Sequence, residues 1–340
     1  MPGLANLSDF FENPVLTKTI KEVPVETNYI GQRFLPTEDT YDMDFNETVI
    51  ERQADMADII DSGAEIPLTD RDPVRRISGE ITDMGQSYIV SKKELAALMD
   101  SGNEGRKTMA VKQLLNKTAQ LKRNIDARIE WLRWQALGNG QLVYDKNGIK
   151  LGVDFGVPSD NKVTAAKKWN ADGATILANY ETWVQHYIDK NTNGYSPDVF
   201  VASIETIRTV LNDTAIRKAI TGYSDKLLTL DELNTFLKGR DLPPMEAFDS
   251  KVTYRDVTNG GTRSTVRLLA KNKGVFLKEN GLIGQQLMGP TYENGMKPGI
   301  FARTFTMERP IREVIEVVAA SFPKITNPEL IMTADVLNVD

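Results

Sequence analysis

The segment from Glu104 to Leu137 constrains the fold more than any other part of the chain. Apolar side chains recur there at steps of seven, four, four, three and four residues, which is the spacing of one apolar stripe on an α-helix. At 1.5 Å per residue, a helix of about 34 residues is roughly 50 Å long, which is longer than the packed core of one ordinary domain. We therefore predict a spine helix that braces a larger structure. Its stripe comprises Leu114, Leu121, Ile125, Ile129, Leu132 and Ala136.

Two neighbouring segments carry opposite charge. The predicted helix has eight basic and three acidic side chains, whereas residues 38–72 have twelve acidic and two basic side chains. Surfaces of opposite charge can pair within one molecule or between neighbouring copies, and pairing between copies would make charge an assembly device. The candidate inter-subunit contacts are Asp55, Asp58 and Asp61 on the acidic segment and Lys112, Lys117, Lys122, Arg123 and Arg128 on the helix.

Composition excludes several classes of protein. At 340 residues and 41% hydrophobic content, the chain can form two or three compact units with real cores. The net charge of −6 argues against a general nucleic-acid binder. We expect no membrane span, because no window approaches 18 consecutive apolar residues, and no signal peptide, because the N-terminus lacks a basic start and an apolar core. With no cysteine, disulfides and thiolate metal sites are excluded, which fits a reducing cytoplasm.

Candidate catalytic residues are few. His186 is the only histidine, and its surroundings are those of a surface or half-buried helical residue. The glycines after residue 137 lack the Lys-Ser/Thr ending of a phosphate loop, and Asp145 begins a turn rather than a calcium loop. An enzyme that uses Asp70, Asp72 and Glu80 as acid/base groups or metal ligands remains an alternative. Carboxylates along extended chain are more often a solvated face.

The first half of the chain reads as an arm, a projecting loop and a hairpin. Residues 1–37 combine scattered apolar positions with three prolines, which predicts an extended arm with apolar anchors. Residues 42–50 and 77–84 alternate between apolar and polar and predict a charged pair of strands that must lie on another surface. Residues 138–156 predict a hairpin with Asn-Gly turns at Asn139 and Asn147.

The second half reads as a mixed α+β unit. We predict helices at 175–190, 204–212 and 230–237, with a short buried strand at 199–203. A hairpin is predicted from the alternation on either side of Asn259-Gly-Gly, at 252–258 and 262–269. Further strands are predicted at 273–277, 299–307 and 311–322. The chain shows no fixed-period repeat.

This order of parts resembles the tailed-phage major capsid proteins of the lambda E type, which have the HK97-like fold. The likeness lies in residues 123–140, in Leu151-Gly-Val-Asp-Phe-Gly followed by Trp169, and in residues 275–284 and 308–329. It implies an α+β chain with an N-terminal arm, an extended β loop, a long spine helix with a peripheral sheet, and a compact α+β axial domain. The implied boundaries are 1–37 for the arm, 38–92 for the loop, 93–174 for the spine and peripheral domain, 175–298 for the axial domain, and 299–340 for C-terminal strands completing both domains.

The resemblance also implies a function. Subunits of this family tile pentamers and hexamers of an icosahedral shell that encloses double-stranded DNA, and the extended loop lies across the neighbouring subunit. We accordingly expect no enzymatic activity, cofactor or metal. We expect the chain to associate with copies of itself and to have a scaffold, a portal and a decoration protein as partners. With packaged DNA we expect at most weak, non-specific contact. The expected location is the virion, with assembly in the host cytoplasm. Some relatives form Lys–Asn cross-links or lose a scaffold segment, but no residue pair marks a cross-link here, and we expect no scaffold segment before the arm. Another head or tail structural protein is the main alternative.

Overall fold

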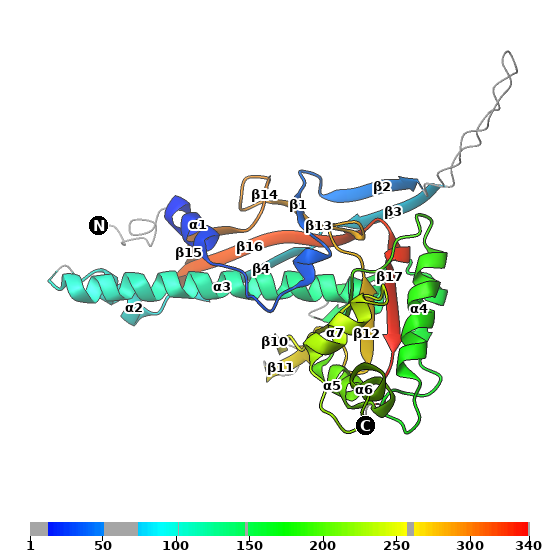
Figure 1. The fold of residues 1–340 in the computed structure, drawn as a ribbon. Coiled ribbons are helices and arrows are strands. Elements are labelled where there is room, and N and C mark those ends of the chain that lie inside the picture. Colours follow the sequence, from blue (N-terminus) through cyan, green and yellow to red (C-terminus); the bar gives the residue numbers. More distant parts are fainter. Residues whose placement is uncertain (1–12, 51–73, 101, 147–148, 257–261, 339–340) are drawn as a thin grey trace, which may run out of the picture.

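The computed structural model describes residues 13–50, 74–100, 102–146, 149–256 and 262–338. Figure 1 shows an elongated part, in which one long helix runs under a long sheet, and a compact part at one end of that helix. None of the helices in the described ranges is both long and apolar enough to cross a lipid bilayer.

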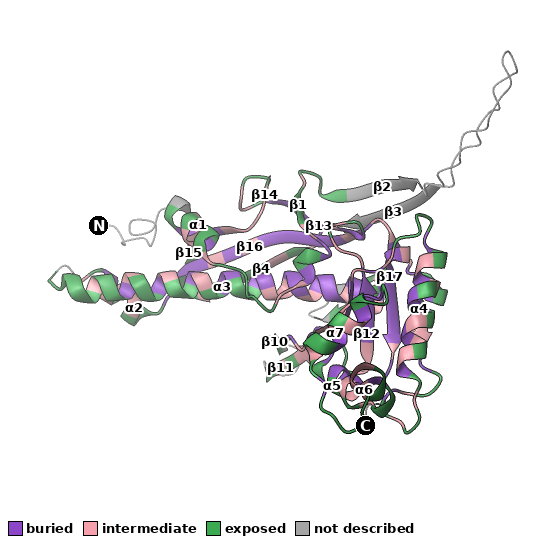
Figure 2. Cartoon of the chain, viewed as in Figure 1, coloured by how far each residue is buried: buried purple, intermediate pink, exposed green. Residues whose placement is uncertain are grey.

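The long helix is α3 (Glu104–Asn139), and it confirms the predicted spine. It begins where the Asn103 side chain accepts a hydrogen bond from the Arg106 N–H, at 3.0 Å. It ends at Gly140, which has φ 64° and donates its N–H to the Ala136 carbonyl. The turn predicted at Asn139 is therefore the end of the helix. All six residues of the predicted apolar stripe are buried, as Figure 2 shows along one side of α3.

The long sheet lies against α3. Its central strand is β16 (Ile311–Ile325), which pairs with β13 (Gly284–Thr291) and then with β15 (Phe301–Glu308) along successive segments. Strand β4 (Asp83–Ile89) pairs antiparallel with β16, β1 (Thr37–Asp39) pairs parallel with β13, and β14 (Lys297–Pro298) also pairs with β13. Ile315, Val317 and Ala319 are buried in the same apolar cluster as the α3 stripe residue Leu121, because alternate residues of a strand share one face.

The N-terminal segment contains a helix, so the prediction of an extended arm was wrong for residues 13–22. Helix α1 (Asn13–Glu22) buries Leu16 and Ile20 in the cluster beneath the long sheet, which offsets the cost of ordering the segment. The helical turn η2 (Gly31–Arg33) follows. Helix α2 (Lys92–Leu98) precedes α3 and begins at a capping box formed by Ser91 and Glu94.

The compact part is built on a five-stranded sheet in the order β7-β17-β12-β8-β9. These strands are β7 (Lys162–Thr164), β17 (Ile331–Asp335), β12 (Lys273–Leu277), β8 (Val199–Ala202) and β9 (Met245–Ala247). The helices are α4 (Ile176–Lys190), α5 (Ile204–Asn212), α6 (Thr214–Thr221) and α7 (Leu230–Lys238), of which only α6 was not predicted. Short turns η3 (Ser159–Asn161) and η4 (Pro328–Leu330) precede β7 and β17.

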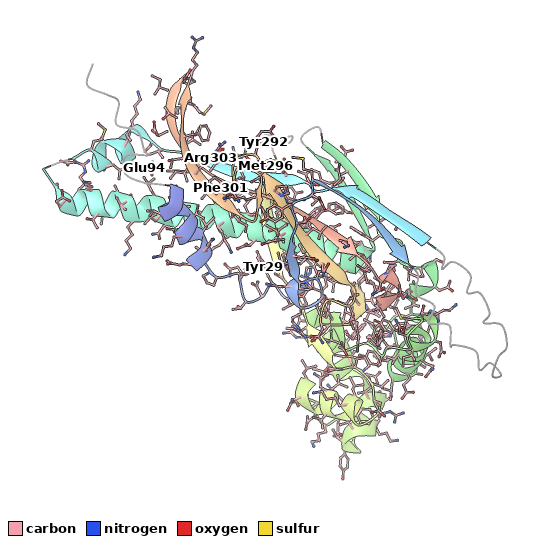
Figure 3. The ribbon with its side chains drawn as sticks, turned by 90° about the horizontal axis from the view of Figure 1, so that it is seen from above. Tyr29, Glu94, Tyr292, Met296, Phe301 and Arg303 are labelled. Carbon is pink, nitrogen blue, oxygen red and sulfur yellow. The ribbon has the colours of Figure 1, made fainter. Side chains whose placement is uncertain are left out.

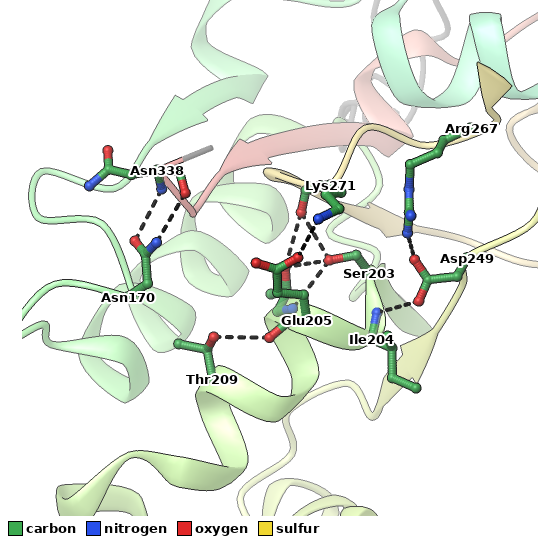
Figure 4. Close-up of polar contacts among 10 residues, drawn as sticks. Asn170, Ser203, Ile204, Glu205, Thr209, Asp249, Arg267, Lys271 and Asn338 are labelled. Carbon is green, nitrogen blue, oxygen red and sulfur yellow. Dashed lines mark hydrogen bonds and ion pairs between the residues drawn. The ribbon is translucent and has the colours of Figure 1, made fainter. Parts of the chain in front are cut away.

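Polar side chains fix the start of α5 against the neighbouring loops (Figure 4). The Ser203 hydroxyl accepts the Thr206 N–H and donates to the Lys271 carbonyl, at 2.9 Å. Asp249 accepts the Ile204 N–H at 2.7 Å and forms an ion pair with Arg267. These contacts satisfy N–H groups that the first turn of a helix leaves without partners.

Three antiparallel strand pairs occur near predicted positions. They are β2 (Asp44–Ile50) with β3 (Val74–Glu80), β5 (Gln141–Lys146) with β6 (Ile149–Asp154), and β10 (Lys251–Asp256) with β11 (Thr262–Arg267). The last two are the predicted hairpins, and the first is the predicted charged pair of strands, whose second strand at 77–84 was misplaced because it runs across the break between β3 and β4. Each forms a separate two-stranded sheet among the described residues. Figure 1 shows β2 and β3 on the side of the long sheet away from α3, and β10 and β11 on the opposite side, below α3.

Candidate functional site

Three of the five predicted basic contact residues are exposed on α3. Lys112 and Lys117 point into solvent, with the Lys117 Nζ 5.6 Å from the centroid of the Tyr88 ring. Arg123 is exposed, and its Nε lies 4.0 Å from Oε1 of Glu26, a distance at which an exposed pair contributes little. These three side chains are therefore accessible to a second molecule.

Lys122 is buried and already paired. Its side chain is 9% exposed, and its Nζ donates to Asp126 Oδ2 at 2.5 Å, one helical turn further along. Burial raises the pKa of Asp126, although the hydrogen bond from Lys122 opposes that effect. A contact from another chain would have to open this pair, which makes Lys122 a poor partner for an acidic loop.

The guanidinium of Arg128 lies against two aromatic rings. Its guanidinium carbon lies 5.0 Å from the centroid of the Trp131 ring and 5.5 Å from that of the Tyr144 ring. The two rings meet edge to face at 6.1 Å. This arrangement fixes the guanidinium by cation–π contacts and leaves its N–H donors at the edge of the plane.

The acidic candidates cannot be placed in the same way. Asp55, Asp58 and Asp61, like Asp70 and Asp72 of the alternative enzyme, lie outside the described residues. Glu80 is the last residue of β3, opposite Asp44 in the ladder. Within the described ranges, no cluster of three or more histidine and acidic side chains could hold a metal ion.

Sequence reasoning missed a buried charged network on α3. Glu130 is fully buried and accepts hydrogen bonds from the Gly31 N–H at 2.7 Å and from Trp134 Nε1 at 2.8 Å. Arg133 contacts Glu130 at 3.4 Å and donates to the Thr37 hydroxyl at 2.8 Å. Burial lowers the pKa of Arg133. The network thus fastens residues 26–39, which we call the strap, to the side of α3.

The strap also reaches the compact part. Arg33 pairs with Glu246 at 2.7 Å and with Glu279. Beside it, the Phe34 ring meets Trp134 edge to face at 6.4 Å, and Trp134 stacks on Phe248 at 4.2 Å. One short segment therefore holds the spine helix and the compact part together. The signal in the sequence was a second stripe on the helix, at residues 122, 126, 130 and 133, made of charged side chains.

The face of the long sheet opposite α3 carries exposed apolar groups and one ion-paired arginine (Figure 3). Ala302 is buried towards α3, so its neighbours Phe301 and Arg303 point to the other face. Arg303 donates to Glu316 at 2.5 Å and lies 3.8 Å from Glu293. Near it Tyr292 is 85% exposed.

His186 has the place that its sequence predicted. It is half-buried on α4, whose apolar side is formed by the buried residues Tyr180, Trp183 and Tyr187. The nearby Asp160 has its pKa lowered by the hydrogen bond from Lys190. Among the described residues, His186 belongs to no group of three or more histidine and acidic side chains that could hold a metal ion.

Comparison with known proteins gives a consistent result. The profile described as phage major capsid protein E matches residues 14–336. Among solved structures, the putative capsid protein of a prophage of E. coli CFT073 superposes with a TM-score of 0.61 at 15% identity, covering 98% of this chain and 99% of that chain. A phage-related protein from Bordetella bronchiseptica RB50 superposes with a TM-score of 0.55 at 11% identity, covering 95% and 96%. Among curated protein sequences there is no match.

Proposed function

The chain belongs to the phage major capsid protein E family, and we propose that it assembles into pentamers and hexamers of an icosahedral phage shell around double-stranded DNA. The predicted α+β, HK97-like fold is confirmed by the likeness to the prophage capsid protein over nearly the whole of both chains. Its role is structural and not enzymatic, and its place is the virion capsid.

The observation that carries the proposal is the family match over residues 14–336. The fold supports it, because an elongated unit with projecting parts is suited to tiling. In the described part of the chain, β2 and β3 pair only with each other, and an isolated two-stranded ribbon is at best marginally stable in water. A second copy can supply the surface that this ribbon lacks.

Charge supports the same arrangement. We propose that the acidic segment around Asp55, Asp58 and Asp61 contacts a basic surface of the neighbouring copy. Lys112 and Lys117 are its best candidates, because they are exposed on α3, whereas the exposed Arg123 already lies beside Glu26. Lys122 is engaged with Asp126 and Arg128 with two rings, so neither is needed for this contact.

We also propose a domain organisation for the chain and partner proteins for its assembly. We keep the arm, extended loop, spine and peripheral domain, axial domain and C-terminal strands with their predicted boundaries, although residues 284–298 contribute β13 and β14 to the long sheet. A scaffold, a portal and a decoration protein would act during assembly in the host cytoplasm. With a net charge of −6, contact with packaged DNA would be weak and non-specific.

Electron microscopy of the purified protein, alone and with its scaffold partner, tests the proposal. Closed shells or rings of five and six subunits are the expected result, with light scattering reporting particles far larger than 38.0 kDa. A small closed oligomer or a monomer at all protein and salt concentrations, with the scaffold present, would contradict it.

A further inference from the structure

A groove runs along α3 between two hairpins. Its narrower part, of about 150 Å³, is lined by Arg128 and Trp131 of α3, by residues 143–145 of β5 and by residues 252–254 of β10. A wider part, of about 470 Å³, continues along the helix as far as Asn116, between the strap and β10. The two parts form one groove, because they share four lining residues: Asn124, Ala127, Val252 and Thr253.

A strand edge of each hairpin borders this groove, because consecutive residues of one strand line it in each case, 143–145 of β5 and 252–254 of β10. The Leu268 N–H donates to the Ser250 carbonyl, so residues 250 and 268 form a hydrogen-bonded pair. In an antiparallel ladder, such pairs alternate with non-bonded pairs. Val252 is thus bonded to its partner on β11, whereas the N–H and C=O of Thr253 point away from β11.

The same reasoning applies to β5. The Phe155 N–H donates to the Gly140 carbonyl, so Leu142 is in a bonded pair and Val143 is not. The N–H and C=O of Val143 therefore point away from β6, and its side chain is 62% exposed. An extended peptide can add to such an edge through main-chain hydrogen bonds.

Arg128 supplies a charged contact at the centre of the groove. Trp131 and Tyr144 hold its guanidinium, yet no carboxylate of the described residues forms an ion pair with it. A guanidinium fixed in this way is prepared to bind a carboxylate through two parallel hydrogen bonds. Lys251 and Arg123 add positive charge along the same groove.

We propose that this groove binds an extended, acidic peptide segment of a partner protein, which adds as a strand to β5 or β10 and places one carboxylate on Arg128. That the peptide comes from a separate partner, and not from a neighbouring copy of this chain, rests on the proposed function in a shell. Copies in a shell are related by rotations about axes that cross the wall, so each copy presents the same face to the same side. With the long sheet in the wall, strands β2 and β3 of every copy lie on the side of the sheet away from α3, whereas β10 and β11 lie below α3 (Figure 1).

Nucleic acid fits the groove less well than a peptide does. The phosphates of a nucleic acid form a continuous line of negative charge, and the groove is lined by Glu26 at one end and Asp145 at the other. A peptide with a single carboxylate at Arg128 avoids both. Strand edges also present N–H and C=O groups in the spacing of a polypeptide main chain.

The test uses a fluorescently labelled synthetic peptide of alternating threonine and valine with one central glutamate, and fluorescence anisotropy with the full-length protein. The peptide should bind, and Arg128→Gln should weaken binding roughly tenfold or more, as expected for a lost charge-assisted hydrogen bond. Lys112→Gln, on the same helix outside the groove, should leave binding unchanged. Circular dichroism checks that each variant is folded.

A second pair of variants tests the strand edge. Val143→Pro removes an N–H that points into the groove and leaves the bonded pairs of the hairpin, so it should abolish binding. Gly152→Pro on β6 is the matched control, because Gly152 lies opposite Val143 and its N–H points away from β5. It should preserve binding.

Several results would overturn the inference: no binding to the parent protein, equal binding of a peptide with glutamine in place of glutamate, or no effect of Arg128→Gln. Equal binding of a duplex DNA oligonucleotide at Arg128 would make this a phosphate site instead. Tighter binding of a peptide covering residues 51–66 would assign the groove to the chain's own loop. Electron microscopy separates the two proposals, because Arg128→Gln should form normal shells while losing the peptide.

Discussion

Gly31 donates its backbone N–H to Glu130 Oε1 at 2.7 Å, and a Cβ atom at residue 31 would lie 2.8 Å from that same oxygen. Only glycine lets the strap approach the spine helix closely enough for this hydrogen bond. Because Glu130 is fully buried, its carboxylate depends on the Gly31 N–H, on Trp134 Nε1 and on Arg133 for compensation.

Gly31→Ala should therefore destabilise the chain. The new methyl group must displace both oxygens of Glu130, and overpacking of this kind costs about 1–3 kcal/mol. Thermal unfolding of the soluble protein would measure the loss. Gly105→Ala is the control: Gly105 is exposed in the first turn of α3, where alanine should be neutral or stabilising by about 0.5–1 kcal/mol. Equal effects of the two substitutions would contradict the proposed role of Gly31.

The buried pair of Lys122 and Asp126 yields a second prediction. Asp126→Asn leaves the ammonium of Lys122 buried without a negative partner, which should cost about 3 kcal/mol in denaturant unfolding. Replacing both residues, with Lys122→Met and Asp126→Leu, removes the uncompensated charge and should recover most of that loss. If the double variant is as unstable as the single one, the charge is not the cause.

The spine helix illustrates how far the sequence determines this fold. Its length and apolar stripe follow from local spacing, so α3 was predicted to within two residues at its C-terminal end. The hairpins β5–β6 and β10–β11 were found because alternation and turn residues are also local. Helix α1 was missed because scattered prolines outweighed the apolar spacing of Leu16 and Ile20, whose burial depends on residues far along the chain.

The contacts between the strap, α3 and the compact part could not be predicted from the sequence, because they join residues that are far apart in it. Gly31 and Glu130 are 99 positions apart, and nothing near either residue in sequence indicates the other. Charge counting treated Lys122 as a surface residue like Lys112, since both carry the same charge on the same helix. Their difference comes from the strap and long sheet, which cover one side of α3 and leave the other open.

The capping box of α2 predicts a dependence on pH. Burial alone would raise the pKa of Glu94, but hydrogen bonds from the hydroxyl and N–H of Ser91 and from Tyr88 outweigh it and lower the pKa below 4.5. A lowered pKa in the folded chain stabilises folding above the unfolded value, and this contribution disappears as pH falls through the folded value.

The stability difference between the parent and Glu94→Gln should accordingly be present at neutral pH and vanish in acid, below the folded pKa of Glu94. Unfolding at a series of pH values would measure it, with Glu308→Gln, a change at an exposed residue of β15, as the control. The pKa of Asp126 is shifted in the opposite direction, because burial raises it in the folded chain. The contribution of Asp126 to folding stability therefore decreases as the pH rises from 3.8 through the folded pKa. A difference for Glu94→Gln that does not change with pH would rule out the cap as its source.

Two substitutions on α4 should differ in their effect on stability, because one residue has a structural hydrogen bond to lose and, among the described residues, the other has none. His186→Gln should change stability by less than about 1 kcal/mol and leave assembly intact, because His186 is half-buried and a polar replacement fits there. Tyr187→Phe removes the hydroxyl that donates to the Leu330 carbonyl at 2.9 Å and leaves that carbonyl unsatisfied, at a cost of about 1–3 kcal/mol. Loss of shells on His186→Gln would mean that this histidine has a role that its contacts do not indicate.

The last prediction concerns charge between copies. Reversing Asp55, Asp58 and Asp61 to lysine should weaken shell assembly while the compact part stays folded, because the acidic segment would then repel the exposed cations of α3. Each exposed pair contributes only about 0–1 kcal/mol, but a shell repeats the contact at every subunit. Light scattering at low and high salt would measure the effect, which should shrink as salt screens charges beyond about 8 Å at physiological ionic strength.

The complementary variant sharpens this test. Lys112→Glu with Lys117→Glu should weaken assembly of the parent and partly restore assembly of the triple reversal, since opposite charges then face each other again. The same double substitution should not affect peptide binding at Arg128, which lies in the groove on α3. If the triple reversal assembles at low salt as well as the parent does, the acidic segment is a solvated face, and shape rather than charge must hold neighbouring copies together.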